Sequence, residues 1–266
     1  MVDGSAATQL TPTLAPEISG DTELILVEIP EFFKSIMAAD AAINPWYTDV
    51  KMAGHAWAAE ILGFSETISQ KILEADFALM AAAFIPFGSK EQLRGLVDWL
   101  YWVAMFDDRI DEGDLRNDPI GAATEILETL AVLDDEYPMI NPKDNPVRSN
   151  DIISLKKDLA FGTEANLIIV LMKQGNSLQE AMNRADEMLD ECYKTWDNAF
   201  QAMPKWGEEI DRQVLQLVEA YRVLALGNID WSFRTTRYLG ETGAEVRATR
   251  ILAIPEEYIQ KYDCNN

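Results

Sequence analysis

Apolar and polar positions alternate with the period of an α-helix along most of this chain. Apolar residues recur at intervals of three and four from Leu93 to Leu100, and aromatic residues extend the apolar character onto a second face as far as Phe106. We therefore expect this helix to be buried nearly all round. No stretch alternates with the two-residue period of a half-buried strand. The sequence predicts an all-α fold.

Prolines, glycines and capping residues divide this pattern into separate helices. Pro45 suits a helix start, Ser89 and Ser177 are typical N-caps, and Pro204 marks a stop. The expected helices cover residues 45–63, 66–83, 89–111, 119–136, 150–161, 164–173, 177–203 and 207–237.

The distribution of prolines and helical pattern predicts one helical domain with two short extensions. Residues 1–30 contain three prolines and no helical period, so we expect a flexible N-terminal arm. Residues 31–250 form the predicted single domain, and residues 251–266 form a C-terminal tail.

Composition and charge narrow the possible partners. The chain has 266 residues, 48% of them hydrophobic, and a formal net charge of −23. Such an acidic surface repels nucleic acid and anionic membranes. Two distant cysteines do not suggest a disulfide framework. We see neither a signal peptide nor an apolar run of about 18 residues that would span a membrane, so we expect a cytoplasmic protein.

Three aspartates lie at the C-terminal end of the central helix. Asp107 and Asp111 are four residues apart, and Asp108 and Asp111 are three apart, so all three can share one side of the helix. The negative end of the helix dipole makes clustered carboxylates costly there without a counter-charge. Hard divalent cations such as Mg²⁺ prefer oxygen ligands. The cluster therefore indicates a metal site.

A second group of oxygen-bearing side chains occurs further along the chain. Asn150, Ser154 and Asp158 are spaced by four residues and line one helix face, where they suit Mg²⁺. Lys157 beside them is a candidate phosphate contact. An ordinary helix cap at Asn150 with an exposed serine at 154 explains the same spacing equally well.

A third group of candidate binding residues lies at the C-terminal end of the longest predicted helix. Arg237 offers a fork of donors for a phosphate, and the Tyr238 hydroxyl offers another. An arginine near a helix C-terminus is also favourable through the helix dipole alone. Trp231 and Phe233 just before it are core residues in most proteins.

Together, the three motifs resemble the class I terpene cyclases, and their flanks resemble the fungal sesquiterpene synthases. The resemblance rests on the order Asp107-Asp108-x-x-Asp111, then Asn150 to Asp158, then Arg237-Tyr238, and it covers about residues 25 to 245. It implies a class I terpenoid synthase-like helical bundle in which both metal motifs bind Mg²⁺, three ions in all. It further implies that Arg237, Tyr238 and a lysine bind the diphosphate of a prenyl substrate, usually farnesyl diphosphate, which the enzyme ionises and cyclises.

The spacing of the motifs departs from that family. Only the 38 residues from Glu112 to Ser149 separate the two metal motifs, where the family has several helices and a diphosphate-sensing arginine. The chain thus resembles an incomplete bundle with an internal block missing. An 18-residue helix carries the chain about 27 Å away from the aspartates. We expect Asn150 to lie at the far end of the bundle from Asp107 unless the following loop is nearly taut.

This gap leaves an alternative to an active cyclase. A catalytically impaired, shortened or splice form would retain only a helical scaffold, with a missing cavity wall and metal motifs that do not face each other. With either interpretation, we expect this chain to turn over farnesyl diphosphate poorly or not at all, and its exposed apolar faces to favour a homodimer or aggregation. A chain-elongating prenyltransferase is disfavoured, because a second aspartate-rich motif is absent.

Overall fold

The computed structural model describes residues 23–61, 64, 66–111, 115–116, 118, 120–123, 126, 148–163 and 166–262. Within helices, the side chains of a few of these residues, Asp111 among them, lie outside the description. The long helices are α1 (Tyr47–Ile61), α2 (Glu66–Ala75), α3 (Phe77–Phe84), α4 (Lys90–Asp111), α6 (Arg148–Phe161), α7 (Leu167–Lys173), α8 (Leu178–Gln201) and α9 (Glu208–Arg234). Short elements are α10 (Thr236–Leu239), α11 (Gly243–Thr249), α12 (Glu256–Ile259), β1 (Leu24–Glu28) and β2 (Ile251–Pro255).

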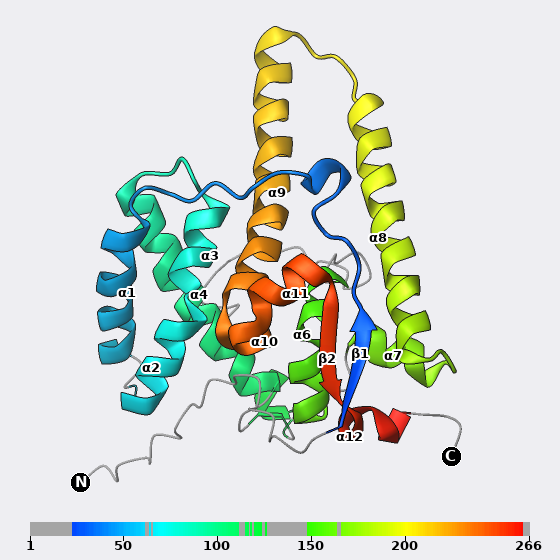
Figure 1. Cartoon of the computed structure of the whole chain (residues 1–266). Coiled ribbons are helices and arrows are strands. Elements are labelled where there is room, and N and C mark those ends of the chain that lie inside the picture. Colours follow the sequence, from blue (N-terminus) through cyan, green and yellow to red (C-terminus); the bar gives the residue numbers. More distant parts are fainter. Residues whose placement is uncertain are drawn as a thin grey trace, which may run out of the picture.

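Helix α3 lies at the centre of one half of the bundle. It is short and almost entirely apolar, and it packs against α9 and α4, while α1 covers α4 and α3 (Figure 1). In the other half, α6 packs against α7, α9 and α10, and α7 lies against α8. The predicted all-α class is confirmed, apart from one two-stranded sheet.

The sheet is a feature that the sequence pattern did not reveal. Strands β1 and β2 pair antiparallel, with Leu26 opposite Ala253. They lie within the residues that we expected to be a flexible arm and a tail, and the expectation of no strand was wrong. Each strand is a five-residue, mostly apolar run, and its partner lies more than 200 residues away. A local pattern therefore cannot show the pairing.

Two predicted helices are broken in the structure. The helix expected over residues 66–83 ends at Ala75 and restarts at Phe77, because Asp76 adopts a left-handed backbone conformation with φ 52°. The helix expected to continue to Arg237 ends at Arg234, and the Thr235 side chain then caps α10 by accepting a hydrogen bond from the Arg237 amide. Both breaks lie next to the cavity described below.

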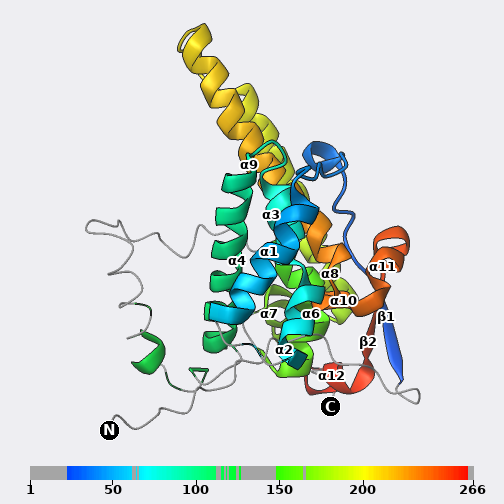
Figure 2. The ribbon, with the colours of Figure 1, turned by 90° about the vertical axis from the view of Figure 1, so that its left-hand side faces the viewer.

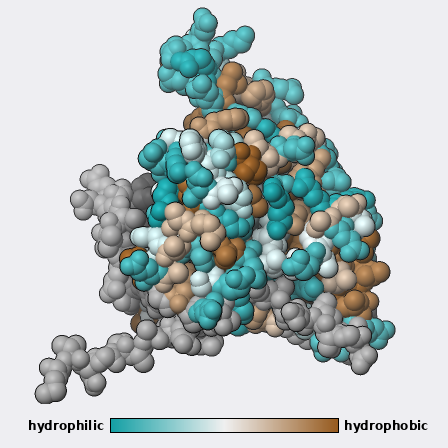
Figure 3. All heavy atoms as spheres, turned by 60° about the vertical axis from the view of Figure 1, so that its left-hand side comes forward, coloured by the Kyte–Doolittle hydropathy of each residue, from teal (hydrophilic) through white to brown (hydrophobic). Residues whose placement is uncertain are grey.

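The helices α8 and α9 project beyond the rest of the bundle (Figures 1 and 2). Along the projecting half of α9, apolar side chains recur at intervals of three and four residues, and four of them are exposed: Ile210, Leu217, Tyr221 and Leu224. Apolar atoms follow this projection below a hydrophilic tip (Figure 3). Helix α4 is likewise not buried all round as expected, since Trp99 and Trp102 are 51% and 37% exposed.

The segment between the metal motifs is mostly outside the described residues. The helix expected over residues 119–136 falls there, except that residues 120–123 and 126 are described and helical. Across the part of the chain that is described, no helix combines the length and apolar character needed to cross a membrane.

The contact between α3 and α9 depends on Gly227. A Cβ added there would lie 3.0 Å from the backbone and side chain of Ala83. We predict that Gly227→Ala destabilises the protein by about 1–3 kcal/mol through overpacking. Gly95 on α4 is the matched control, because a Cβ there meets nothing within 4 Å. Gly95→Ala should stabilise by about 0.5–1 kcal/mol. Urea unfolding measures both, and equal stability of the two variants would contradict this packing.

Candidate active site

A cavity of about 340 Å³ lies among α3, α4, α6, α9 and α10. Its volume falls in the range of about 300–1,000 Å³ that is typical of small-molecule sites. Most of its wall is aromatic or aliphatic, and a few polar side chains lie on it. The lining residues are Phe77, Met80, Leu100, Val103, Ala104, Asp107, Asn150, Asn228, Trp231, Arg237 and Tyr238.

The cavity brings together residues from all three sequence motifs. Asp107 reaches it from the C-terminal end of α4, Asn150 from the first turn of α6, and Arg237 and Tyr238 from α10. Asn150 therefore lies at the same cavity as Asp107 and not at the far end of the bundle, which was the expected place only without a nearly taut connection. Helix α6 begins beside the end of α4 and is held there by its packing on α10 and α9.

A buried ion pair links the aspartate motif to the arginine motif. Arg237 Nη2 donates to Asp108 Oδ1 at 2.6 Å, and Nη1 donates to Oδ2 at 3.3 Å. Their side chains are 7% and 6% exposed. The guanidinium also lies 5.9 Å from the ring centres of Phe77 and Tyr238. Both oxygens of Asp108 thus accept hydrogen bonds from Arg237 in this conformation.

The second metal motif forms a buried hydrogen-bonded group. Ser154 Oγ donates to Asp158 Oδ2 at 2.6 Å, and Asn166 Nδ2 donates to the same oxygen at 2.8 Å. Lys157 Nζ lies 3.5 Å from Asp158 Oδ1. Ser154, Lys157 and Asp158 are buried and are not part of the cavity wall, whereas Asn150 is. The motif therefore reaches the cavity through its first residue.

The electrostatic environment keeps Tyr238 protonated. Burial raises the pKa of its hydroxyl, while the positive charges of Arg237 and Lys157 act in the opposite direction. The neutral phenol is therefore a hydrogen-bond donor at the edge of the cavity. Burial also raises the pKa of Asp151, although its carboxylate accepts a hydrogen bond from the Leu167 amide, which lowers it.

The donor set facing the cavity fits a hard divalent cation. Asp107 supplies a carboxylate and Asn150 an amide oxygen, and Ser154 lies one turn further along α6. Mg²⁺ takes one or two protein carboxylates, retains several waters and bridges to substrate phosphates. Among the described residues, no three His, Cys, Asp or Glu side chains form a ready-made metal cluster. The side chain of Asp111 lies outside the description.

Several residues of the site could not be found from the motifs. Phe77 and Asn228 line the cavity, and Trp231, which the sequence suggested as core, does so as well. Asn166 fixes the second motif, since it bonds Asp158, donates to the Asp151 carbonyl and caps α7. An asparagine before a short apolar helix was a signal for that cap. The role of Phe77 depends on the break at Asp76, which no local pattern indicated.

A known protein family matches the segment that contains the second metal motif. The profile described as "Terpene synthase family 2, C-terminal metal binding" matches residues 144–195. This segment contains all of α6 and α7 and most of α8. It therefore includes Asn150, Ser154 and Asp158.

Individual fungal proteins are similar along most of the chain. A (+)-eremophilene synthase of Gibberella fujikuroi is 31% identical, with 90% of this chain and 97% of the relative covered. Terpene cyclase 4 of the same organism is 29% identical, over 95% and 96%. The Silphinene synthase peniA of Penicillium patulum is 25% identical, over 89% and 92%.

The first of these alignments also shows how much shorter this chain is than its relative. It extends over 347 residues, whereas the whole chain has 266. At least 81 aligned positions of the relative, the difference between these lengths, therefore have no counterpart here. A deficit of this size agrees with the missing internal block that the motif spacing predicts.

The ion pair between Asp108 and Arg237 generates a stability prediction. Asp108→Asn leaves a buried guanidinium without its counter-charge, and breaking a buried pair in this way costs about 3–5 kcal/mol. The control is Glu28→Gln, which removes the exposed partner of Arg250. Such surface pairs contribute about 0–1 kcal/mol. Thermal and urea unfolding compare the two variants, and equal losses would show that the buried pair does not hold the site together.

Proposed function

Because this chain belongs to the class I terpene cyclases of the fungal sesquiterpene synthase type, we propose that it ionises and cyclises farnesyl diphosphate with Mg²⁺ and releases diphosphate. The observation that carries the proposal is the convergence of Asp107, Asn150, Arg237 and Tyr238 on one aromatic-lined cavity. The polar residues lie on part of the wall, and apolar side chains form the rest. This division suits a substrate with an anionic head and a hydrocarbon tail.

Residues from two helices would hold the metal. Asp107 on α4, with Asp111 one turn later in the sequence, lines the same cavity as Asn150 on α6, and Ser154 and Asp158 continue the second motif. Bound Mg²⁺, three ions by analogy with the family, would neutralise charge on the leaving diphosphate. Asp108 would join this set only by giving up its hydrogen bonds to Arg237, so we assign it first to holding that arginine.

Donors on α10 would bind the diphosphate itself. Arg237 presents a guanidinium at the cavity wall, and the neutral Tyr238 hydroxyl lies next to it. Lys157, buried near Tyr238, adds positive charge behind this wall. Preorganised donors of this kind favour the developing negative charge on the leaving group more than they favour the intact substrate.

The apolar wall would protect the carbocation. The rings of Phe77, Trp231 and Tyr238 form a contiguous aromatic surface, with centroids 5.7 Å apart in each neighbouring pair. Aromatic faces attract a cation without reacting with it, and aliphatic residues such as Leu100 and Val103 exclude water. A non-catalytic helical scaffold would have metal motifs that do not face each other. Because residues of both motifs line one cavity, we favour the enzyme over this alternative.

Incubation with farnesyl diphosphate tests the proposal. We predict Mg²⁺-dependent release of diphosphate and a cyclic sesquiterpene, together with some terpene alcohol, because the shortened chain leaves a route for water. Gas chromatography with mass spectrometry identifies the products, and geranylgeranyl diphosphate is the chain-length control. Diphosphate release no faster with Mg²⁺ than with EDTA would contradict the proposal.

Metal binding should also be visible without turnover. Because ligands that bind only the folded state stabilise it, Mg²⁺ at a hundred times its dissociation constant would add about 2.7 kcal/mol of stability. Asp107→Asn should remove much of the rise in melting temperature. Asp98→Asn is the control, since Asp98 lies on the same helix but pairs with Arg94. An equal rise in both variants would exclude Asp107 as a ligand.

We further propose that two copies associate through the apolar stripe of α9 formed by Ile210, Val214, Leu217, Tyr221 and Leu224. Intervals of three and four residues suit helix-to-helix packing. Leu217→Glu should convert a dimer to a monomer in analytical ultracentrifugation, whereas Gln216→Glu adds the same charge outside the stripe and should not. A wild-type monomer at all accessible concentrations would refute the dimer.

A further inference from the structure

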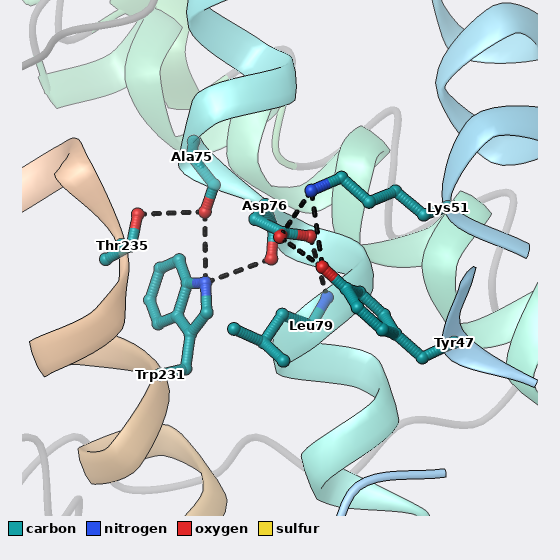
Figure 4. Close-up of polar contacts among 7 residues, drawn as sticks. All are labelled: Tyr47, Lys51, Ala75, Asp76, Leu79, Trp231 and Thr235. Atoms are coloured by element: carbon teal, nitrogen blue, oxygen red, sulfur yellow. Dashed lines mark hydrogen bonds and ion pairs between the residues drawn. The ribbon is translucent and has the colours of Figure 1, made fainter. Parts of the chain in front are cut away.

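The break between α2 and α3 is built around one aspartate. Asp76 has a φ of 52°, a conformation that Asn and Asp tolerate better than most residues. Its Oδ1 accepts a hydrogen bond from the Leu79 amide at 3.0 Å and so caps α3. The side chain thus stabilises the turn that ends one helix and starts the next (Figure 4).

The other carboxylate oxygen of Asp76 is bound to α1. Tyr47 donates its hydroxyl to Oδ2 at 2.5 Å, and Lys51 Nζ lies 2.6 Å from the same oxygen (Figure 4). Burial and the neighbouring carboxylate both raise the pKa of Tyr47, so its hydroxyl stays protonated. Asp76 is only 14% exposed, and both of its oxygens are engaged. The turn therefore cannot move without breaking several charge-assisted bonds.

The opposite side of the same turn holds α9. The helix break leaves the carbonyl oxygens of Ala75 and Asp76 directed at α9, where Trp231 Nε1 donates to them at 3.0 and 3.1 Å. Thr235 Oγ1 donates to the Ala75 carbonyl at 2.8 Å. The indole is thereby fixed at its polar end, and rotation of the ring would leave a buried N–H unpaired.

Trp231 is the middle ring of the aromatic wall. It is 2% exposed and lies between Phe77, at an interplanar angle of 33°, and Tyr238, at 83°. Phe77 itself is the first residue of α3, directly after Asp76. One turn of the backbone therefore sets the position of two of the three rings.

We propose that Asp76 is a positioning residue for the cyclisation: held by Tyr47 and Lys51, it fixes the orientation of Trp231 and Phe77 and so limits the product distribution. Asp76 is not among the residues that line the cavity, and its side-chain partners among the described residues are Tyr47, Lys51 and Leu79 rather than metal-motif residues or Arg237. Its influence passes through the two backbone carbonyls. The consequence for products rests on the proposed cyclase activity, whereas the orientation of Trp231 does not.

The test begins with a measurement independent of activity. In protein labelled with ¹⁵N-tryptophan, the Trp231 indole signal is identified by its loss in Trp231→Phe. Asp76→Asn keeps an oxygen to cap α3 but weakens the bonds to Tyr47 and Lys51. We expect its Trp231 indole N–H to exchange with solvent about tenfold faster than in wild type, as for the loss of one charge-assisted hydrogen bond.

Two lysine variants keep the test decisive should Asp76→Asn fail to fold. Lys51→Met leaves Asp76 in place and removes only its ion pair, and it should shift the indole exchange in the same direction. Lys34→Met is the matched control, because Lys34 also pairs with aspartates and is 29% exposed, against 25% for Lys51. Equal indole exchange in the two lysine variants would overturn the proposal.

The second readout is the product mixture from farnesyl diphosphate. Asp76→Asn and Lys51→Met should lower the share of the main product at least about twofold and reduce kcat with little change in KM, because diphosphate contacts are untouched. Lys34→Met should keep the wild-type mixture. An unchanged mixture in Asp76→Asn would refute the role in specificity. A wild-type chain without product would refute the cyclase, and the indole measurement would still decide the positioning.

Discussion

The buried ion pair between Asp108 and Arg237 is the contact on which the site depends. Carboxylates at the C-terminal end of α4 face the negative end of its helix dipole, and the guanidinium compensates this charge. The pair fastens α10 to the end of α4, and α10 in turn packs on α6. Asp107, Asn150 and Arg237 therefore meet at one cavity because this bond holds their helices together.

Contacts between the motif helices explain how a shortened chain still brings its motif residues to one cavity. Several contacts between described residues place the motif helices without the chain between the motifs: α3 packs on α9 at Gly227, and Asn166 connects α7 to Asp158 within α6. The projecting half of α9, away from this cavity, carries exposed apolar side chains, and Leu217 and Tyr221 are 57% and 61% exposed.

Local patterns in the sequence predicted most of the described helices well. Helix α8 begins at the Ser177 capping box, and α4 and α6 agree with their expected bounds within about two residues. The three motifs were chosen by spacing and by resemblance, and four of their residues line the cavity. The spacing of residues within one helix is a local property of the sequence, so it can be recognised without knowledge of the fold.

The features that were missed all depend on contacts between distant residues. The pairing of β1 with β2 and the bond from Trp231 to the Ala75 carbonyl each join residues more than 150 positions apart. The left-handed turn at Asp76 interrupts a stretch with good helical pattern, and only its partners Tyr47 and Lys51 explain it. The reach of the chain left open whether Asn150 would lie near Asp107, because chain length does not determine how helices pack.

The most direct test of this account is a crystal structure with Mn²⁺ and inorganic diphosphate, read by anomalous scattering. Mn²⁺ substitutes for Mg²⁺ at oxygen sites and is located independently of the protein density. We expect Mn²⁺ between Asp107 and the α6 motif, with diphosphate in contact with Arg237. Metal bound at only one motif, or diphosphate outside this cavity, would contradict the claim that the three motifs form one site.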